Sequence, residues 1–193
     1  MAVERLLPAN ESVVLIPATE RAGVPQGIYE GGIQPIDTIT SDLINAYFNV
    51  KTYGDINAKG GGNISCAIKD DMELGLTDSD SDDERTLCSV GQSEELTAFQ
   101  FQAVMNAFRD ADLTGQGVFN LAYALTFGPD VPFIIAHRVG YTNDTEAEAG
   151  QRWDFYYVWT DVQIPQHGDA TNLSFQETFI PKSIVNFGYT LAA

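Results

Sequence analysis

The sequence has 193 residues, 44% of them hydrophobic and 11% aromatic, which suits a single globular domain spanning residues 1–193. It carries 27 acidic and 10 basic residues, a formal net charge of -17. A protein that holds duplex DNA needs clustered Lys and Arg, and no such cluster occurs, so the composition argues against stable nucleic-acid binding. We see no signal-peptide core and no apolar run of about 18 residues, so we expect no membrane association.

Hydrophobic periodicity predicts a mainly β fold, either a β-sandwich or a barrel-like sheet, with one α-helix packed on it. Residues 1–11 are broken by Pro8 and are expected to form an N-terminal arm. The predicted strands are residues 12–17, 35–40, 43–52, 63–69, 97–107, 131–139, 153–164, 171–180 and 184–191. The predicted loops are residues 19–32, the glycine-rich 54–62, 70–95 and 141–150.

Two segments give the sharpest predictions. Residues 118–127 have helical spacing and are followed by Gly128 and Pro129, so they form the only expected helix. Residues 153–164 are strongly aromatic, with Trp153, Phe155, Tyr157 and Trp159 on one face of a strand. Because such a strand is unstable in water, it must lie centrally, with a core on one side and partial cover on the other. Pro181 is expected to separate the last two strands.

The loop at residues 70–95 holds ten acidic residues and one basic residue, Arg85. Its Asp78, Asp80 and Asp82 match the opening of an EF-hand calcium loop. The sixth position is Asp83, where glycine is needed, and the twelfth is Ser89, where glutamate is needed. We therefore favour a hydrated acidic loop and predict no metal.

A catalytic site is not indicated. The two histidines, His137 and His167, lack a nucleophile motif, a metal-ligand pair or a phosphate loop nearby in sequence. Cys66 and Cys88 are interpreted as reduced thiols. We predict no enzyme activity and no cofactor.

The positive signal lies in the strand faces. Residues 63–69, 99–106 and 171–180 each combine an apolar side with a side of uncharged polar residues. Exposed strands commonly carry Thr and other polar residues, so chance and β-propensity explain this pattern about as well as function does. The functional interpretation is a wet but weakly adhesive surface, such as the lining of a channel.

The order of these elements resembles a known family. The segment 102–112, the short helix after it, and the sequence Pro-Phe-Ile-Ile-Ala-His-Arg-Val-Gly at 132–140 are similar to major tail (tail tube) proteins of long-tailed, siphovirus-type phages. The strand ending in Thr-Asp-Val at 160–162 and the segment 175–191 share the resemblance, which is closest to phages of actinobacteria. It covers residues 95–193 well and the first half loosely.

This resemblance implies a structural virion protein, assembled in the host cytoplasm. Its inner sheets would join into a barrel in a homohexameric ring, and rings would stack into a tube around the tape-measure protein. DNA would pass through without specific binding, and the tube would meet tail terminator and baseplate proteins. The residues expected to face the lumen are Asn63, Ser65, Gln100, Gln102, Asn172, Ser174, Gln176 and Thr178. The residues expected in an inter-ring loop are Asp78, Asp80, Asp82, Asp83, Glu84 and Arg85.

Two alternatives remain open at this point. One is a monomeric β-sandwich that binds carbohydrate or another ligand on exposed indoles of Trp153 and Trp159. The other is a different phage tail or connector protein on the same fold. Exposure of the two indoles separates the first alternative from a tube subunit, in which at least one face of that strand is buried.

Overall fold

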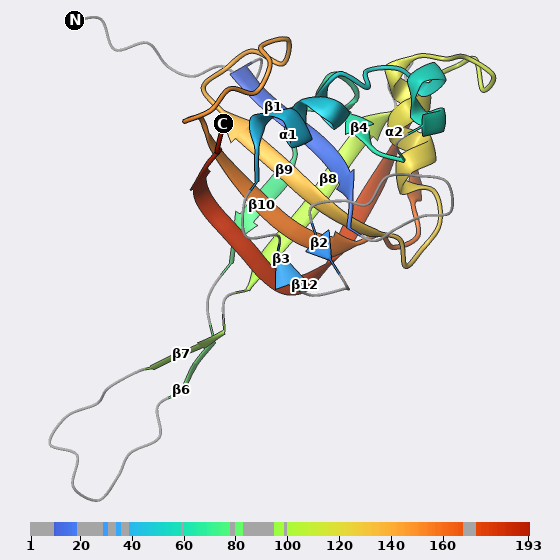
Figure 1. The fold of residues 1–193 in the computed structure, drawn as a ribbon. Coiled ribbons are helices and arrows are strands. Elements are labelled where there is room, and N and C mark those ends of the chain that lie inside the picture. Colours follow the sequence, from blue (N-terminus) through green and yellow to red (C-terminus); the bar gives the residue numbers. More distant parts are fainter. Residues whose placement is uncertain are drawn as a thin grey trace, which may run out of the picture.

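The computed structural model describes residues 10–18, 29–30, 34–35, 39–58, 60–77, 80–82, 95–98, 100–167 and 173–193. The protein is mainly β, and eight antiparallel strands form its principal sheet in the order β4-β1-β9-β10-β12-β8-β5, with β11 also paired to β12 (Figure 1). The bounds along this order are β4 (Gly62–Asn63), β1 (Glu11–Pro17), β9 (Pro132–Val139), β10 (Arg152–Trp159), β12 (Ser174–Thr190), β8 (Phe101–Phe108), β5 (Glu73–Leu76) and β11 (Ile164–Gln166).

The two ends of this sheet are linked by the short segment 62–69, so the sheet is barrel-like. At one end, β4 pairs with Val14 and Leu15 of β1. At the other, Ile68 forms a bridge with Ala107 of β8, and the Lys69 N–H donates to the Asn106 carbonyl at 2.8 Å. The segment therefore spans from β1 to β8 and closes the curved sheet around an inner core.

Each side of the sheet has its own core. The inner cluster takes Leu15, Phe133, Tyr156 and Val158 from the strands and is covered by α2 (Val118–Thr126). The outer cluster takes the alternate residues of the same strands and is covered by α1 (Ser41–Phe48), which lies across β1 and β9 in Figure 1. Period-two alternation sends neighbouring residues to opposite clusters, which is why β1 and β9 read as continuous apolar runs.

The aromatic strand is central, as predicted. β10 pairs with β9 on one side and β12 on the other. Trp153, Phe155 and Tyr157 lie in the outer cluster, with Trp159 packed against it, while Tyr156 and Val158 lie in the inner cluster. Both faces of this strand are therefore buried, whereas the sequence predicted a core on one face and only partial cover on the other.

The helix predicted at residues 118–127 is confirmed as α2, but it is not alone. Residues 43–52, predicted as a strand, contain most of α1. The Thr40 hydroxyl accepts from the Leu43 N–H at 3.3 Å and caps this helix. Ile44, Tyr47 and Phe48 follow at helical spacing and are the buried residues of α1. The strand prediction was wrong because β-favouring residue types outweighed the cap and this stripe.

The glycine-rich connection is also packed rather than free. Gly61 lies so close to β1 that an added Cβ would meet the Leu15 carbonyl oxygen at 2.4 Å. Gly62 would meet the Val50 carbonyl oxygen at 2.8 Å. A flexible hairpin was expected over residues 54–62, but a 3-10 helix, η2 (Tyr53–Ala58), precedes these two buried glycines. Absence of a side chain here permits close approach of two backbones.

Two further strand predictions need correction. Residues 63–69 alternate, yet after Asn63 they form a 3-10 helix, η3 (Ser65–Ala67). Pro181 does not interrupt the last strand, because β12 continues through it beside a register shift in β10. Pro181 pairs with Val158 of β10, and no described strand pairs with the other side of β12 there, so it occupies an edge position, where proline is tolerated.

The long acidic segment is not wholly irregular. Residues 70–95 contain β5, and β6 (Asp80–Asp82) pairs with β7 (Glu95–Ala98) in a hairpin. Figure 1 shows this hairpin projecting away from the principal sheet. In a two-residue pair, β2 (Tyr29–Glu30) lies within the predicted loop 19–32, and β3 (Gln34–Pro35) overlaps the predicted strand 35–40 only at Pro35. The predicted arm lies outside the described residues except for Asn10 and Glu11, and Glu11 begins β1.

Candidate assembly surfaces

Besides the short β4 and β11, each of which pairs with a single strand, two strands of the sheet have an open edge within the described ranges. β5 pairs with β8 on one side, and no described strand pairs with its other side. β12 pairs with β8 only as far as Phe179, whereas its opposite side continues along β10 to Thr190. The second half of β12 therefore offers a row of backbone donors and acceptors along one edge. Such edges promote pairing with another chain.

Next to these edges lies a sheet face that no described helix covers, which we call the polar face. It consists of the outward residues of β8 from Gln102 to Asn106 and those of the first half of β12, while Phe108 at the end of β8 packs on Phe119 of α2. The register places Gln176 opposite Asn106 and Thr178 opposite Val104. Gln102 is exposed and donates through Nε2 to Glu73 Oε2 at 2.6 Å. The face is therefore mostly uncharged amide and hydroxyl, as its sequence alternation predicted.

The predicted polar residues divide into two groups. Gln102, Ser174, Gln176 and Thr178 share the polar face, although Ser174 is 8% exposed beneath Lys69, whose Nζ donates to its hydroxyl at 2.9 Å. Gln100 is exposed immediately before β8. Asn172 lies outside the described residues, as do Asp78, Asp83, Glu84 and Arg85 of the predicted inter-ring loop, while Asp80 and Asp82 lie on β6.

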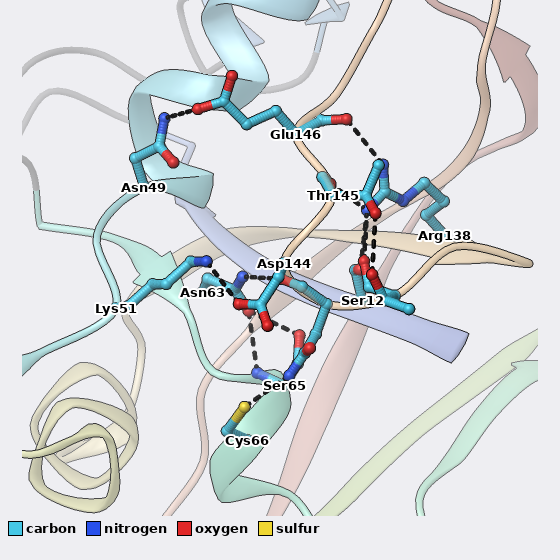
Figure 2. Close-up of polar contacts among 12 residues, drawn as sticks. Ser12, Asn49, Lys51, Asn63, Ser65, Cys66, Arg138, Asp144, Thr145 and Glu146 are labelled. Carbon is cyan, nitrogen blue, oxygen red and sulfur yellow. Dashed lines mark hydrogen bonds and ion pairs between the residues drawn. The ribbon is translucent and has the colours of Figure 1, made fainter. Parts of the chain in front are cut away.

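Asn63 and Ser65 do not share the polar face. They belong to the segment that closes the barrel, where Asn63 is 4% exposed (Figure 2). The Ser65 hydroxyl donates to Asn63 Oδ1 at 2.6 Å and accepts from the Val13 N–H at 2.8 Å. The Asn63 side-chain amide in turn donates to the Asn143 carbonyl at 3.4 Å. These two polar side chains therefore stabilise the closure.

The turn between β9 and β10 is held by a buried cation that sequence reasoning missed. Arg138 is 1% exposed, and its guanidinium donates to the carbonyls of Thr142, Thr145 and Glu146 (Figure 2). It also donates to the Gln151 side-chain oxygen at 2.8 Å and the Ser12 hydroxyl at 3.1 Å. Burial lowers the pKa of this guanidinium, but the five acceptors replace water around its charge. An Arg near the end of a mostly apolar strand was the available signal.

A buried acid was missed as well. Glu177 is 1% exposed and lies on the same side of β12 as Phe175 and Phe179. Its Oε1 accepts from the Asp161 N–H at 2.9 Å, and its Oε2 has no partner among the described residues. Burial raises the pKa of Glu177 to about 8, and the nearby Asp161 charge adds to this effect. The alternation of β12 itself places this carboxyl on the inward side.

No catalytic or metal site emerges from the described part of the chain. His137 Nε2 lies 3.4 Å from Glu11 Oε2, whereas His167 lies just after β11, so the two histidines occupy different sites. No group of three metal-ligating side chains occurs among the described residues. The motif that resembles a calcium loop, residues 78–89, is described only at residues 80–82, and Cys88 lies outside the described residues. Cys66 forms no disulfide and is exposed. Of the helices described, none is long and apolar enough to cross a membrane.

The indoles do not support the ligand-binding alternative. Trp153 is 1% exposed and packs edge-on against Phe48 with ring centroids 6.5 Å apart. Trp159 is half-buried, with the Lys182 ammonium 4.2 Å from its ring centroid. Trp153 therefore cannot serve as an exposed stacking platform.

Comparison with known protein families shows which kind of protein carries these surfaces. The family model described as phage tail tube protein matches residues 36–193. The chain belongs to this family. A search of curated proteins gives no significant match. The match begins before α1 and includes α2, β5 to β12 and therefore both open edges and the polar face. As a tail tube protein, the chain is a structural component of a phage virion rather than a typical enzyme.

Proposed function

We propose that this tail tube protein forms homohexameric rings that stack into a hollow tube. The tube conducts the viral DNA and encloses the tape-measure protein. It belongs to a long-tailed, siphovirus-type phage, of an actinobacterial host by the resemblance of residues 95–193, and is assembled in the host cytoplasm. Tail terminator and baseplate proteins bind its two ends. Family membership, together with two open strand edges on one sheet, is the observation that carries this proposal.

The open edges give the physical reason for a ring. An isolated subunit exposes unpaired backbone groups along β5 and along the second half of β12. Pairing these edges on adjoining subunits supplies the missing backbone hydrogen bonds and leaves neither of the two edges free once the ring closes. A closed ring is therefore more stable than a row of subunits that ends in two free edges.

We assign the polar face to the wall of the lumen. Gln102, Gln176 and Thr178 carry no charge, and the chain as a whole has a formal net charge of -17. Amides and hydroxyls keep such a wall hydrated, while the surplus of acid repels phosphate, so DNA can slide without adhering. Asn63 and Ser65 are left out of this assignment because their side chains stabilise the barrel closure.

The assignment is tested by placing cations on the wall. Gln102→Lys combined with Thr178→Lys is expected to leave tubes intact but slow genome ejection, because six copies put twelve cations in each ring against the passing phosphates. The matched control is Ala111→Lys combined with Ala149→Lys, which adds the same charge at two exposed alanines elsewhere. Ejection is followed in phage particles by release of labelled DNA. Equal ejection rates in the two double variants would contradict the lumen assignment.

A further inference from the structure

An apolar groove of about 460 Å³ lies where the end of α2 meets β11 and the start of β12. Tyr123 and the buried Phe175 line it, with their rings edge to face and centroids 5.5 Å apart. Phe127, Val162 and Leu173 also line it and are 64%, 63% and 55% exposed. Three large apolar side chains around one hollow, each more than half exposed, are typical of an interaction surface.

A positively charged side chain, that of Arg109, also lines the groove. The Arg109 guanidinium stacks on the Tyr123 ring, with its carbon 3.2 Å from the ring centroid. The ion pairs between described residues are Lys51 with Asp144 and His137 with Glu11, so no described carboxylate pairs with Arg109. Desolvating this cation beneath a partner without a carboxylate would be costly, so the groove selects an occupant that is both apolar and acidic.

We infer that this groove binds the β6–β7 hairpin of a second copy of the chain. This inference rests on the proposed tube assembly, which brings copies together. Among the described strands β6 and β7 pair only with each other, and Figure 1 shows them projecting away from the sheet. The hairpin sequence, residues 78–95, contains seven acidic residues and one basic residue, and it carries the apolar Leu87 and Val90. Its charge and its apolar content complement the groove.

Length and charge both favour this occupant over the N-terminal arm. Residues 77–100 leave the sheet and return to it, so the chain can extend at most about 40 Å from β5, roughly the diameter of a small domain and enough to reach an adjoining subunit. Residues 1–9 contain one acid, Glu4, and one base, Arg5, and so offer Arg109 no net charge complement. The acidic hairpin is the segment that satisfies both requirements.

Photo-cross-linking tests the inference directly. A photoreactive benzoylphenylalanine replaces the exposed Leu173, and tubes are assembled from an equal mixture of isotopically light and heavy subunits. After irradiation, mass spectrometry should find Leu173-position cross-links to peptides within residues 78–95, with light–heavy pairs proving that two copies are joined. The same probe at Val139, which is 43% exposed and does not line the groove, should not give that product.

Every outcome of the cross-linking experiment either supports or overturns the inference. Cross-links to residues 1–11, to another part of the body, or only within one subunit overturn the inference, as does the absence of cross-links in well-formed tubes. If the wild-type protein forms no tubes, the proposed function itself fails, and this inference falls with it. Tubes that form normally while the probe reacts elsewhere overturn the groove assignment alone.

A charge variant provides a second readout. Arg109→Gln removes the cation but keeps a polar, though shorter, side chain, and it should raise the protein concentration needed for tube assembly about tenfold. Arg152→Gln makes the same change at an exposed position on β10 and should leave that concentration unchanged. Equal effects of the two variants would show that general charge, rather than this groove, governs assembly.

Discussion

Replacing Glu177 with glutamine is expected to remove a large part of the pH dependence of the subunit's stability. The carboxyl is buried in the inner core and bonded on one oxygen only, to the Asp161 N–H. Burial raises its pKa to about 8 from an ordinary value of 4.5. The folded protein therefore keeps a proton at neutral pH that the unfolded chain releases.

The sign and size of the effect follow from linkage. Between pH 4.5 and about 8 the folded state binds more protons than the unfolded state at this position. Its stabilising contribution is therefore complete below pH 4.5 and is lost as the pH rises to about 8, at about 1.4 kcal/mol per pH unit. The loss across the whole window amounts to about 5 kcal/mol. Glutamine does not titrate, matches the protonated carboxyl in shape, and can still accept from the Asp161 N–H.

The assay is urea unfolding of the monomeric subunit at five pH values from 5 to 9, followed by tryptophan fluorescence. The difference in unfolding free energy between Glu177→Gln and wild type isolates this carboxyl from the other acids, and it should grow as the pH rises from 5 to 8. Glu148→Gln, an exposed acid between β9 and β10, is the control and should follow the wild type. Parallel pH profiles for wild type and Glu177→Gln would show that this carboxyl does not govern the pH dependence of stability.

Two other substitutions test the packing and the buried polar network. Gly61→Ala should destabilise the fold by about 1–3 kcal/mol, because its Cβ would meet the Leu15 carbonyl oxygen, whereas Gly75→Ala, with no atom within 4 Å of the added Cβ, should change the free energy of unfolding little. Arg138→Met should cost at least about 3 kcal/mol, since several buried acceptors lose their donor, whereas the exposed Arg152→Met should be nearly neutral. Urea unfolding measures both, and equal losses within either pair would contradict the packing described.

Some elements could be predicted because several local signals agreed. β10 combines aromatic residues with period-two alternation, and α2 combines helical spacing with Gly128 and Pro129 at its end. α1 was missed because its residue types favour strands, while its cap and its buried stripe favour a helix. The residues of η3 alternate like a strand, but their position is set by contacts with β1 and β8 that lie far away in sequence.

The candidate surfaces also divide into those set by local sequence signals and those set by contacts between distant residues. The polar face could be predicted because alternation along β8 and β12 is a local property of each strand. The groove could not, because its walls come from Arg109, from the end of α2 and from both sides of β11, which only the fold brings together. Glu177 was predictable in principle, since it occupies the inward position between two phenylalanines.

The proposed tube depends on pairing of the open sheet edges when copies of the chain associate. Negative-stain electron microscopy of the purified wild-type protein, over a range of concentrations, tests it most directly. Hollow tubes built of stacked sixfold rings are the expected result. Well-folded subunits that remain monomeric at every concentration would contradict it.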